Sequence, residues 1–350
     1  MSARAGEWPY GLTATATHDT KRGEDARARL IALAEIPGEW TSAVARWKVL
    51  NAPHLVIAGD IRAPSATSEY MLYQALLGAW PVGERDTSFA GRMQAYALKA
   101  AREGKQETSW LNPNETYEAG LHTFIKKILD PVVSAEFINS METLARRLAL
   151  LGALNSLSQV TLKATMPGVP DFYQGTEFWD LSLVDPDNRR PVDFVERAHV
   201  LASVETPDWH RLAENWPTGH VKLAWTRHLL KLRTELADVF ANGDYEPLQV
   251  SGTHRDHVIA FARRRGRDAA IVAVAKSFAA FSQGGRAWPR AESYDASLDV
   301  GGYAVEGFAD ADASELRLCD LFRQLPVAVL KARVVSAPKP APRRAQAASA

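Results

Sequence analysis

Two short stretches of this 350-residue chain have the pattern of a β-strand that ends in a polar loop. The first, residues 12–17, carries threonine at alternate positions and runs directly into His18 and Asp19. The second, residues 168–177, is a short apolar strand enclosed by prolines and glycines, which indicates a tightly constrained strand end. Because α/β proteins place functional residues at the carboxyl ends of parallel strands, these stretches predict a site between them.

Helical periodicity follows both strands. Apolar residues at i, i+4, i+7 and i+8 predict a helix over 24–36, which Pro37-Gly38 is expected to end. Its first turn holds Glu24 and Asp25, where the helix dipole favours acidic side chains. Longer apolar stripes predict two further helices, over 134–157 and 221–236.

The remaining segments differ in pattern from these. Residues 41–131 show no strand pattern, and amphipathic spacing predicts a helical insertion with helices at 68–80, 89–103 and 115–129. Alternating and continuous apolar runs predict a β-rich domain over 245–335. Residues 336–350 are alanine, proline and basic residues, which is typical of a disordered tail.

Composition excludes several classes of protein. The formal net charge is zero, which gives no reason to expect nucleic-acid or membrane binding. The single cysteine, Cys319, excludes an intrachain disulfide, and no stretch approaches the roughly 20 apolar residues of a membrane span. Without an apolar signal core at the N-terminus, we expect a cytoplasmic protein. Phosphate-binding glycine loops, dinucleotide fingerprints and zinc spacings are all missing, so no cofactor or metal is predicted.

His18 and Asp19 are the leading candidates for chemistry. At a strand end they would point into a barrel mouth, where a carboxylate can stabilise an oxocarbenium-like transition state. The alternative is that Asp19 caps the following helix and His18 is a surface residue with its hydrogen bonds satisfied. Lys21 and Arg22 would oppose the dipole of that helix, so they are either solvated or hold hydroxyls or a carboxylate in a cleft.

Other polar loops leave two interpretations open. Glu177 could be catalytic, but anchoring of a neighbouring loop is preferred because most loop carboxylates are structural or solvated. Trp110, beside Asn112-Pro113-Asn114, could stack on a sugar or simply pack. The charged run 185–191 could bind hydroxyls, although a hydrogen-bonded turn is slightly preferred.

A family resemblance rests on three longer motifs. These are 17–29 (THDTKRGEDARAR), 171–179 (DFYQGTEFW) with 185–191 (DPDNRRP), and 107–115 (ETSWLNPNE). In these motifs the chain resembles maltooligosyl trehalose synthase, of the α-amylase superfamily, as far as about residue 335. The His-Asp pair and the strand Gly-x-Pro-x-x-Tyr-x-Gly-x-Glu are shared by the wider superfamily, whereas the longer runs are specific.

The resemblance implies a fold and an activity. The fold is α/β: the C-terminal part of a (β/α)8 TIM barrel, its last two strands, over 1–240, with the helical insertion at about 41–131 and then the β-rich domain. Such enzymes convert the reducing-end α-1,4 linkage of a maltooligosaccharide into an α,α-1,1 linkage by a retaining mechanism. The residues that it implicates are Asp19 as the transition-state-stabilising aspartate, and His18, Lys21, Arg22, Trp110 and Tyr173 as substrate-binding residues.

The resemblance covers only part of such an enzyme. The nucleophile and the acid/base belong to earlier barrel strands, which nothing before Leu12 can supply. We therefore expect poor stability or aggregation and no activity for the chain alone, and the missing N-terminal half is a candidate partner. A non-catalytic maltodextrin-binding or regulatory remnant is the alternative. A metal phosphohydrolase site at His18 and Asp19 is a third interpretation, for which further ligands would be needed.

Overall fold

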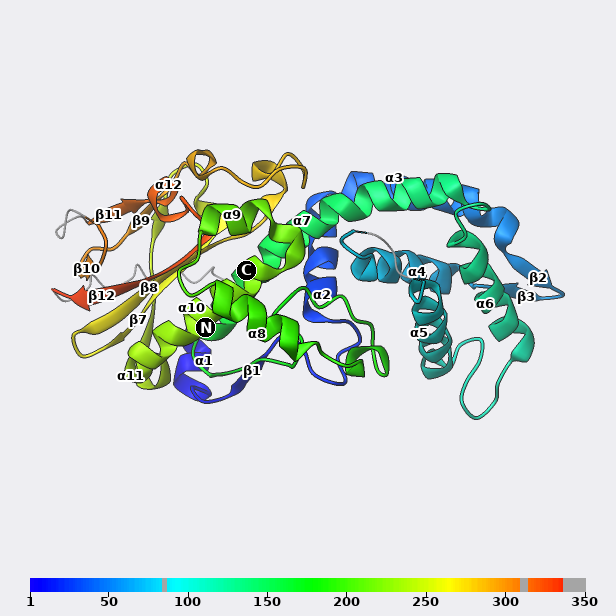
Figure 1. Ribbon diagram of the computed structural model, residues 1–350, viewed down its shortest axis with the longest axis horizontal. Helices are drawn as coiled ribbons and strands as arrows, with labels where there is room; N and C mark the ends of the chain where they lie inside the picture. The colour runs from blue at the N-terminus through cyan, green and yellow to red at the C-terminus, as the bar shows by residue number, and fades with distance from the viewer. Residues whose placement is uncertain (84–86, 309–313, 336–350) are drawn as a thin grey trace, which may run out of the picture.

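The computed structural model describes residues 1–83, 87–308 and 314–335. The predicted tail at 336–350 lies outside these residues. Figure 1 shows a β-rich part at one end, a set of helices at the other, and the long helix α7 (Ala135–Thr165) running between them. The structure is thus a mixture of helices and sheets, and the predicted α/β class is confirmed at that level.

The two predicted strand ends lie side by side. Strand β1 (Leu12–Ala14) pairs in parallel with β4 (Val169–Asp171), and Ala14 is opposite Asp171. Both strands are shorter than the sequence pattern suggested. Since parallel strands present their carboxyl ends at one edge, the loops after β1 and β4 begin next to each other.

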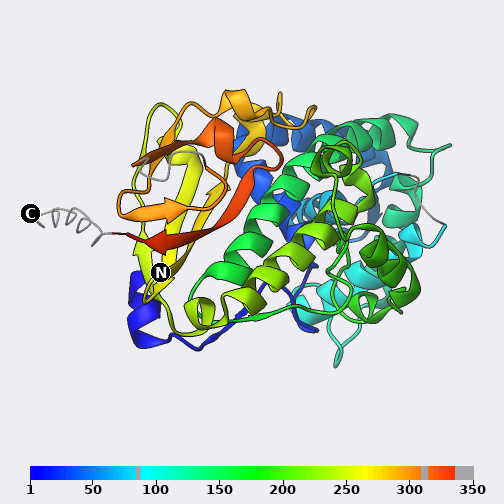
Figure 2. The same ribbon diagram turned by 60° about the vertical axis from the view of Figure 1, so that its left-hand side comes forward.

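Three helices pack together beside this strand pair. Helix α2 (Glu24–Ile31) continues as a 3-10 turn to Glu35, and it packs on α7 and on α4 (Ala66–Ala79). Helix α7 extends eight residues beyond its predicted end, and most of its C-terminal half is buried. Figure 2 shows α7 beside α10 (His220–Glu235), which covers its other side.

The segment predicted to be a helical insertion, at about 41–131, and the residues just before it differ from the sequence prediction in two places. Helix α3 (Pro37–Asn51) starts at Pro37, where the sequence suggested only a helix end, because proline is favoured in the first helical turn. A short antiparallel hairpin, β2 (Val56–Ala58) and β3 (Ile61–Ala63), lies in a segment that was predicted to lack strands. The three helices predicted there are confirmed: α4 (Ala66–Ala79), α5 (Phe89–Gly104) and α6 (Glu115–Ile128).

The β-rich part is an antiparallel sheet beside a smaller one. The five-stranded sheet has the order β10-β12-β8-β7-β5: β5 (Asp244–Pro247), β7 (Val258–Arg265), β8 (Asp268–Ala275), β10 (Tyr303–Val305) and β12 (Val327–Val334). The three-stranded sheet joins β6 (Val250–Ser251), β9 (Ser297–Asp299) and β11 (Glu315–Arg317). The remaining helices are α1 (Ser2–Glu7), α8 (Phe194–Ser203), α9 (Trp209–Glu214), α11 (Ala237–Asn242) and α12 (Leu318–Leu321).

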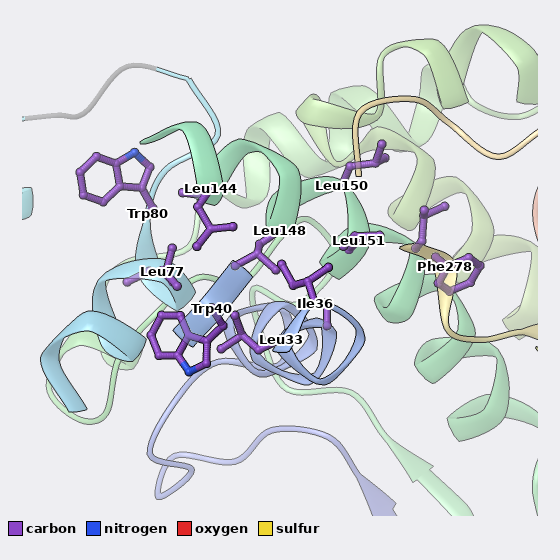
Figure 3. Close-up of a cluster of buried hydrophobic side chains, with 14 of the residues drawn as sticks. Leu33, Ile36, Trp40, Leu77, Trp80, Leu144, Leu148, Leu150, Leu151 and Phe278 are labelled. Atoms are coloured by element: carbon purple, nitrogen blue, oxygen red, sulfur yellow. The ribbon is translucent and has the colours of Figure 1, made fainter. Parts of the chain in front are cut away.

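One apolar core connects these parts. Figure 3 shows leucines of α7 packed against side chains from the 3-10 turn η1 (Ala32–Glu35), α3 and α4, with Phe278 at the side of the β-rich part. A second cluster fills the space between α7, α10 and the five-stranded sheet. In the described part of the chain, no helix combines the length and the apolar character that crossing a membrane requires.

Candidate functional site

The loop after β1 is held by its own hydrogen bonds. The backbone N–H of Thr17 donates to Thr20 Oγ1 at 2.6 Å, and the N–H of Asp19 donates to Thr17 Oγ1 at 3.3 Å. Helix α2 begins only at Glu24, with Gly23 at the N-cap position and no side-chain cap. The alternative in which Asp19 caps this helix is therefore wrong.

Asp19 and His18 are exposed at the end of this loop. The Asp19 carboxylate makes no hydrogen bond or ion pair to any residue that the structure describes. The carbonyl of His18 accepts a hydrogen bond of 2.8 Å from Asn188 Nδ2, which joins the β1 loop to the segment after β4. Backbone hydrogen bonds of the loop thus fix the position of Asp19, and its carboxylate is free to contact a bound molecule.

Lys21 and Arg22 face the helical insertion. Lys21 Nζ lies 3.2 Å from Glu103 Oε2 on α5, although the lysine side chain is 65% exposed. The partly buried Arg22 donates to the hydroxyl of Tyr96 at 3.4 Å and forms a β-bridge with Leu183. Each of these cations thus contacts an oxygen atom of α5, and Lys21 is also largely solvated.

The segment after β4 carries Tyr173 and Glu177. Tyr173 is partly buried, and its carbonyl accepts hydrogen bonds from the backbone and the side chain of Thr176. Glu177 accepts from Arg197 Nε at 2.8 Å, while another nitrogen of this arginine donates to the Gly175 carbonyl. Glu177 therefore anchors the loop after β4, which is the interpretation that the sequence favoured over a catalytic role.

The charged run 185–191 is a hydrogen-bonded turn. Asp187 is bound by Arg92 through two contacts of 2.7 and 2.8 Å, and it accepts from the Leu183 N–H at 2.8 Å. Burial would raise the pKa of Asp187, but the hydrogen bonds from Arg92 and Leu183 outweigh it and lower that pKa. Lys99 of α5 donates to the Asp185 carbonyl at 2.7 Å. Helix α5 thus contacts both strand-end loops.

Trp110 lies apart from this set. It is 56% exposed in the connection between α5 and α6, and the guanidinium of Arg102 lies 4.8 Å from its ring centre. Arg102 is itself paired with Glu118 at 2.7 Å. The contacts that position Trp110 are therefore local to α5, α6 and their connection, and Arg102 lies over its ring.

A buried ion network, which the sequence pattern did not predict, lies behind the loops. The sequence pattern explains Glu24 and Asp25 only as acidic residues favoured by the helix dipole. In the structure both side chains are buried and form ion pairs with Lys222, and Glu24 also pairs with Lys163. A signal was present, because Lys222 falls on the apolar stripe of α10, three residues before Trp225. A lysine at a core position requires a buried partner.

The network shifts the acidity of its carboxylates in opposite directions. Burial would raise the pKa of Glu24, but Lys222 and Lys163 outweigh it and lower that pKa to about 2. For Asp25, which is completely buried, burial outweighs Lys222 and raises the pKa to about 6. Lys222 itself has a raised pKa because its two carboxylate partners outweigh burial.

The arrangement is that of an α/β protein with polar residues at the carboxyl ends of two adjacent parallel strands. Across the described ranges, no three His, Cys, Asp or Glu side chains gather as metal ligands would. The exposed carboxylate beside an imidazole and cationic side chains suits the binding of a polyhydroxylated substrate and the stabilisation of positive charge.

Comparisons with known proteins identify the family. Proteins named maltooligosyl trehalose synthase from two strains of Mycobacterium tuberculosis are 38% identical over 276 residues, which are 79% of this chain and 32% of theirs. The structure of maltooligosyltrehalose synthase from Arthrobacter ramosus matches with a TM-score of 0.72 at 33% identity, covering 94% of this chain and 39% of that one. A Sulfolobus tokodaii structure of the same name has a TM-score of 0.67 at 30% identity, with coverages of 91% and 38%.

No protein-family model matches the chain. The chain nevertheless belongs to the maltooligosyl trehalose synthase family and corresponds to a C-terminal portion of its members. It spans about a third of the length of the relatives from M. tuberculosis.

Proposed function

We propose that this chain supplies the last two strands of the (β/α)8 barrel of a maltooligosyl trehalose synthase, and with them part of its active site. The observation that carries this proposal is the parallel pairing of β1 with β4, whose following loops hold the candidate residues. In this assignment residues 1–240 are barrel, with the insertion at 41–131, and residues 245–335 form a separate β-rich domain.

Asp19 is the proposed catalytic carboxylate of this portion. Its side chain is exposed and has no partner among the described residues, so it is free to face the positive charge that develops at the anomeric carbon. His18, next to it, is placed to hydrogen-bond sugar hydroxyls. The nucleophile and the acid/base of the retaining mechanism would come from residues outside this chain.

The other candidate residues lie in two different parts of the structure. Lys21 and Arg22 stand between the β1 loop and α5, where they would help retain the reducing-end glucose. The nucleophile displaces O4 of this glucose from the anomeric carbon of its neighbour, and the acid/base protonates that O4. The anomeric hydroxyl of the retained glucose then gives its proton to the acid/base and displaces the nucleophile, which forms the α,α-1,1 bond. Tyr173 lies on the neighbouring loop. Trp110, which is 56% exposed, would stack on a sugar further along the maltooligosaccharide.

The test uses the purified chain with maltohexaose, alone and together with the N-terminal portion of a homologue such as the Arthrobacter ramosus enzyme. Loss of reducing ends and the proton NMR signal of the α,α-1,1 anomeric position report the reaction. We expect no conversion by the folded chain alone and conversion in the mixture. Conversion by the chain alone would refute the division of the active site between two segments.

A non-catalytic role in maltodextrin binding makes a different prediction. The chain would then bind maltohexaose tightly by itself, and the mixture would form no α,α-1,1 product. Calorimetric titration of the chain with maltohexaose, run beside the NMR assay, separates the two functions.

A further inference from the structure

Four charged side chains from three helices meet in the interior behind the candidate site. Lys222 Nζ, with a side chain that is 0% exposed, lies 2.5 Å from Glu24 Oε1 and 2.8 Å from Asp25 Oδ2. Lys163 Nζ lies 3.2 Å from Glu24 Oε2. We call these four residues the buried ion network. Its formal charges cancel, so it forms a closed set within the apolar core.

The network contacts both strand-end segments directly. Lys163 Nζ donates to Thr15 Oγ1, one residue after β1, at 2.8 Å. On the β4 side, Lys222 Nζ donates to the Phe178 carbonyl at 3.2 Å, and Asp25 Oδ2 accepts from the Asp180 N–H at 2.6 Å. Charged groups with short, directional hydrogen bonds fix positions more narrowly than apolar contacts, which tolerate repacking.

Backbone contacts at the same place require an unusually close approach. The Gly23 N–H donates to the Ser182 carbonyl at 2.8 Å, and the N–H groups of Asp25 and Ala26 both point to the Asp180 carbonyl at 3.2 Å. A Cβ on Gly23 would lie 2.5 Å from Asp180 Oδ2 and 2.6 Å from the Asp180 carbonyl oxygen. The start of α2 and the segment after β4 are therefore held against each other.

We propose that Lys222 is a positioning residue, which through Glu24 and Asp25 holds the β1 loop and the segment after β4 in one fixed relation. Lys222 itself reaches no substrate. Any effect of Lys222 on sugar binding rests on the proposed function. Lys222 would act by holding His18 and Asp19 in place relative to Asn188 and Tyr173.

Hydrogen exchange of the full chain tests this role without any ligand. In Lys222→Met, we expect exchange of the amides of Gly23, Asp25, Ala26 and Asp180 to accelerate at least tenfold more than exchange of the β8 amides, which reports the loss of global stability. The matched control is Arg263→Met, since Arg263 is also buried but donates to the carbonyls of Thr165, Phe240 and Gly243 instead. Equal protection of the four amides in Lys222→Met and the wild type would overturn the proposal.

A second variant covers the case in which Lys222→Met does not fold. The double variant Lys222→Met/Asp25→Asn lacks the cation but also the uncompensated carboxylate, so it should fold more readily while the same amides lose protection. If the double variant folds with these amides still protected, the proposal is refuted.

Binding of maltohexaose measures the consequence for the site. In the mixture with the N-terminal portion of a homologue, we expect at least a tenfold loss of affinity in Lys222→Met and in Lys222→Met/Asp25→Asn, and a change of less than twofold in Arg263→Met. Equal losses in all three variants would show a general effect of stability and contradict a positioning role. If the wild-type mixture binds no maltohexaose, the proposed function fails, whereas the exchange experiment still decides whether Lys222 positions the loops.

Discussion

The parallel strand pair β1–β4 and the five-stranded sheet near the C-terminus are stabilised by different interactions. Strands β7, β8 and β12 have eight residues each, and all of β8 except its first residue is buried. Strands β1 and β4 have only three residues each, and Leu12 and Val169 are largely exposed. The sheet is held by long ladders and apolar packing, whereas the strand pair depends on the charges of the buried ion network behind it. Order at the candidate site is therefore tied to a few polar contacts.

The largest expected effect is the loss of Lys222. Its replacement by methionine leaves Asp25 without its cation in the interior, which costs about 3–5 kcal/mol of unfolding free energy. Urea denaturation measures this loss. Adding Asp25→Asn to Lys222→Met should recover part of it, since the uncompensated carboxylate is then removed. Strict additivity of the two substitutions would contradict an ionic origin.

Glu24→Gln should cost somewhat less and should depend on pH. The pKa of Glu24 is lowered from 4.5 to about 2, so its ionised form contributes roughly 3 kcal/mol above about pH 4.5. That contribution is lost as the pH falls toward 2, so the stabilities of the variant and the wild type should converge there. Denaturation midpoints between pH 2 and 7 measure the difference.

Asp25→Asn is the matched control, because the pH dependence of the contribution of Asp25 to stability should have the opposite sign. Because the pKa of Asp25 is raised to about 6, its contribution to stability should fall as the pH rises from about 4 to about 6. The asparagine variant should lack that decline. Parallel pH profiles for the two variants would contradict the division of roles between these neighbouring carboxylates.

A conservative substitution in the five-stranded sheet should have a smaller effect on the unfolding free energy. Ile271→Val in β8 removes one buried methylene and should cost about 0.5–1.5 kcal/mol. Hydrogen exchange near Gly23 and Asp180 should stay unchanged, since neither segment depends on β8 for its contacts. Faster exchange at those amides would show that the two regions are not independently ordered.

Asp19→Asn should have the smallest effect on stability. Its carboxylate has no partner among the described residues, so the unfolding free energy should change by less than about 0.5 kcal/mol. Thermal denaturation of both proteins checks this. A loss of several kcal/mol would mean that Asp19 has a structural partner and would weaken its assignment to the site.

Sequence patterns predicted the local elements well but not the contacts between distant ones. The periodicity located α4, α5 and α6 to within about two residues, and the threonine-rich strand led directly to His18 and Asp19. The hairpin at 56–63 was missed because its strands are only three residues long. The ion network was missed because its partners are nearly 200 residues apart and meet only in the folded core.

The most direct test of the account compares Asp19→Asn with the wild-type chain in the presence of the N-terminal portion of a homologue. Formation of the α,α-1,1 anomeric signal from maltohexaose is the measured quantity. If Asp19 stabilises the transition state, the variant should be as stable as the wild type yet form product at least about a hundredfold more slowly. Equal rates of product formation in the two mixtures would contradict the placement of the active site at the ends of β1 and β4.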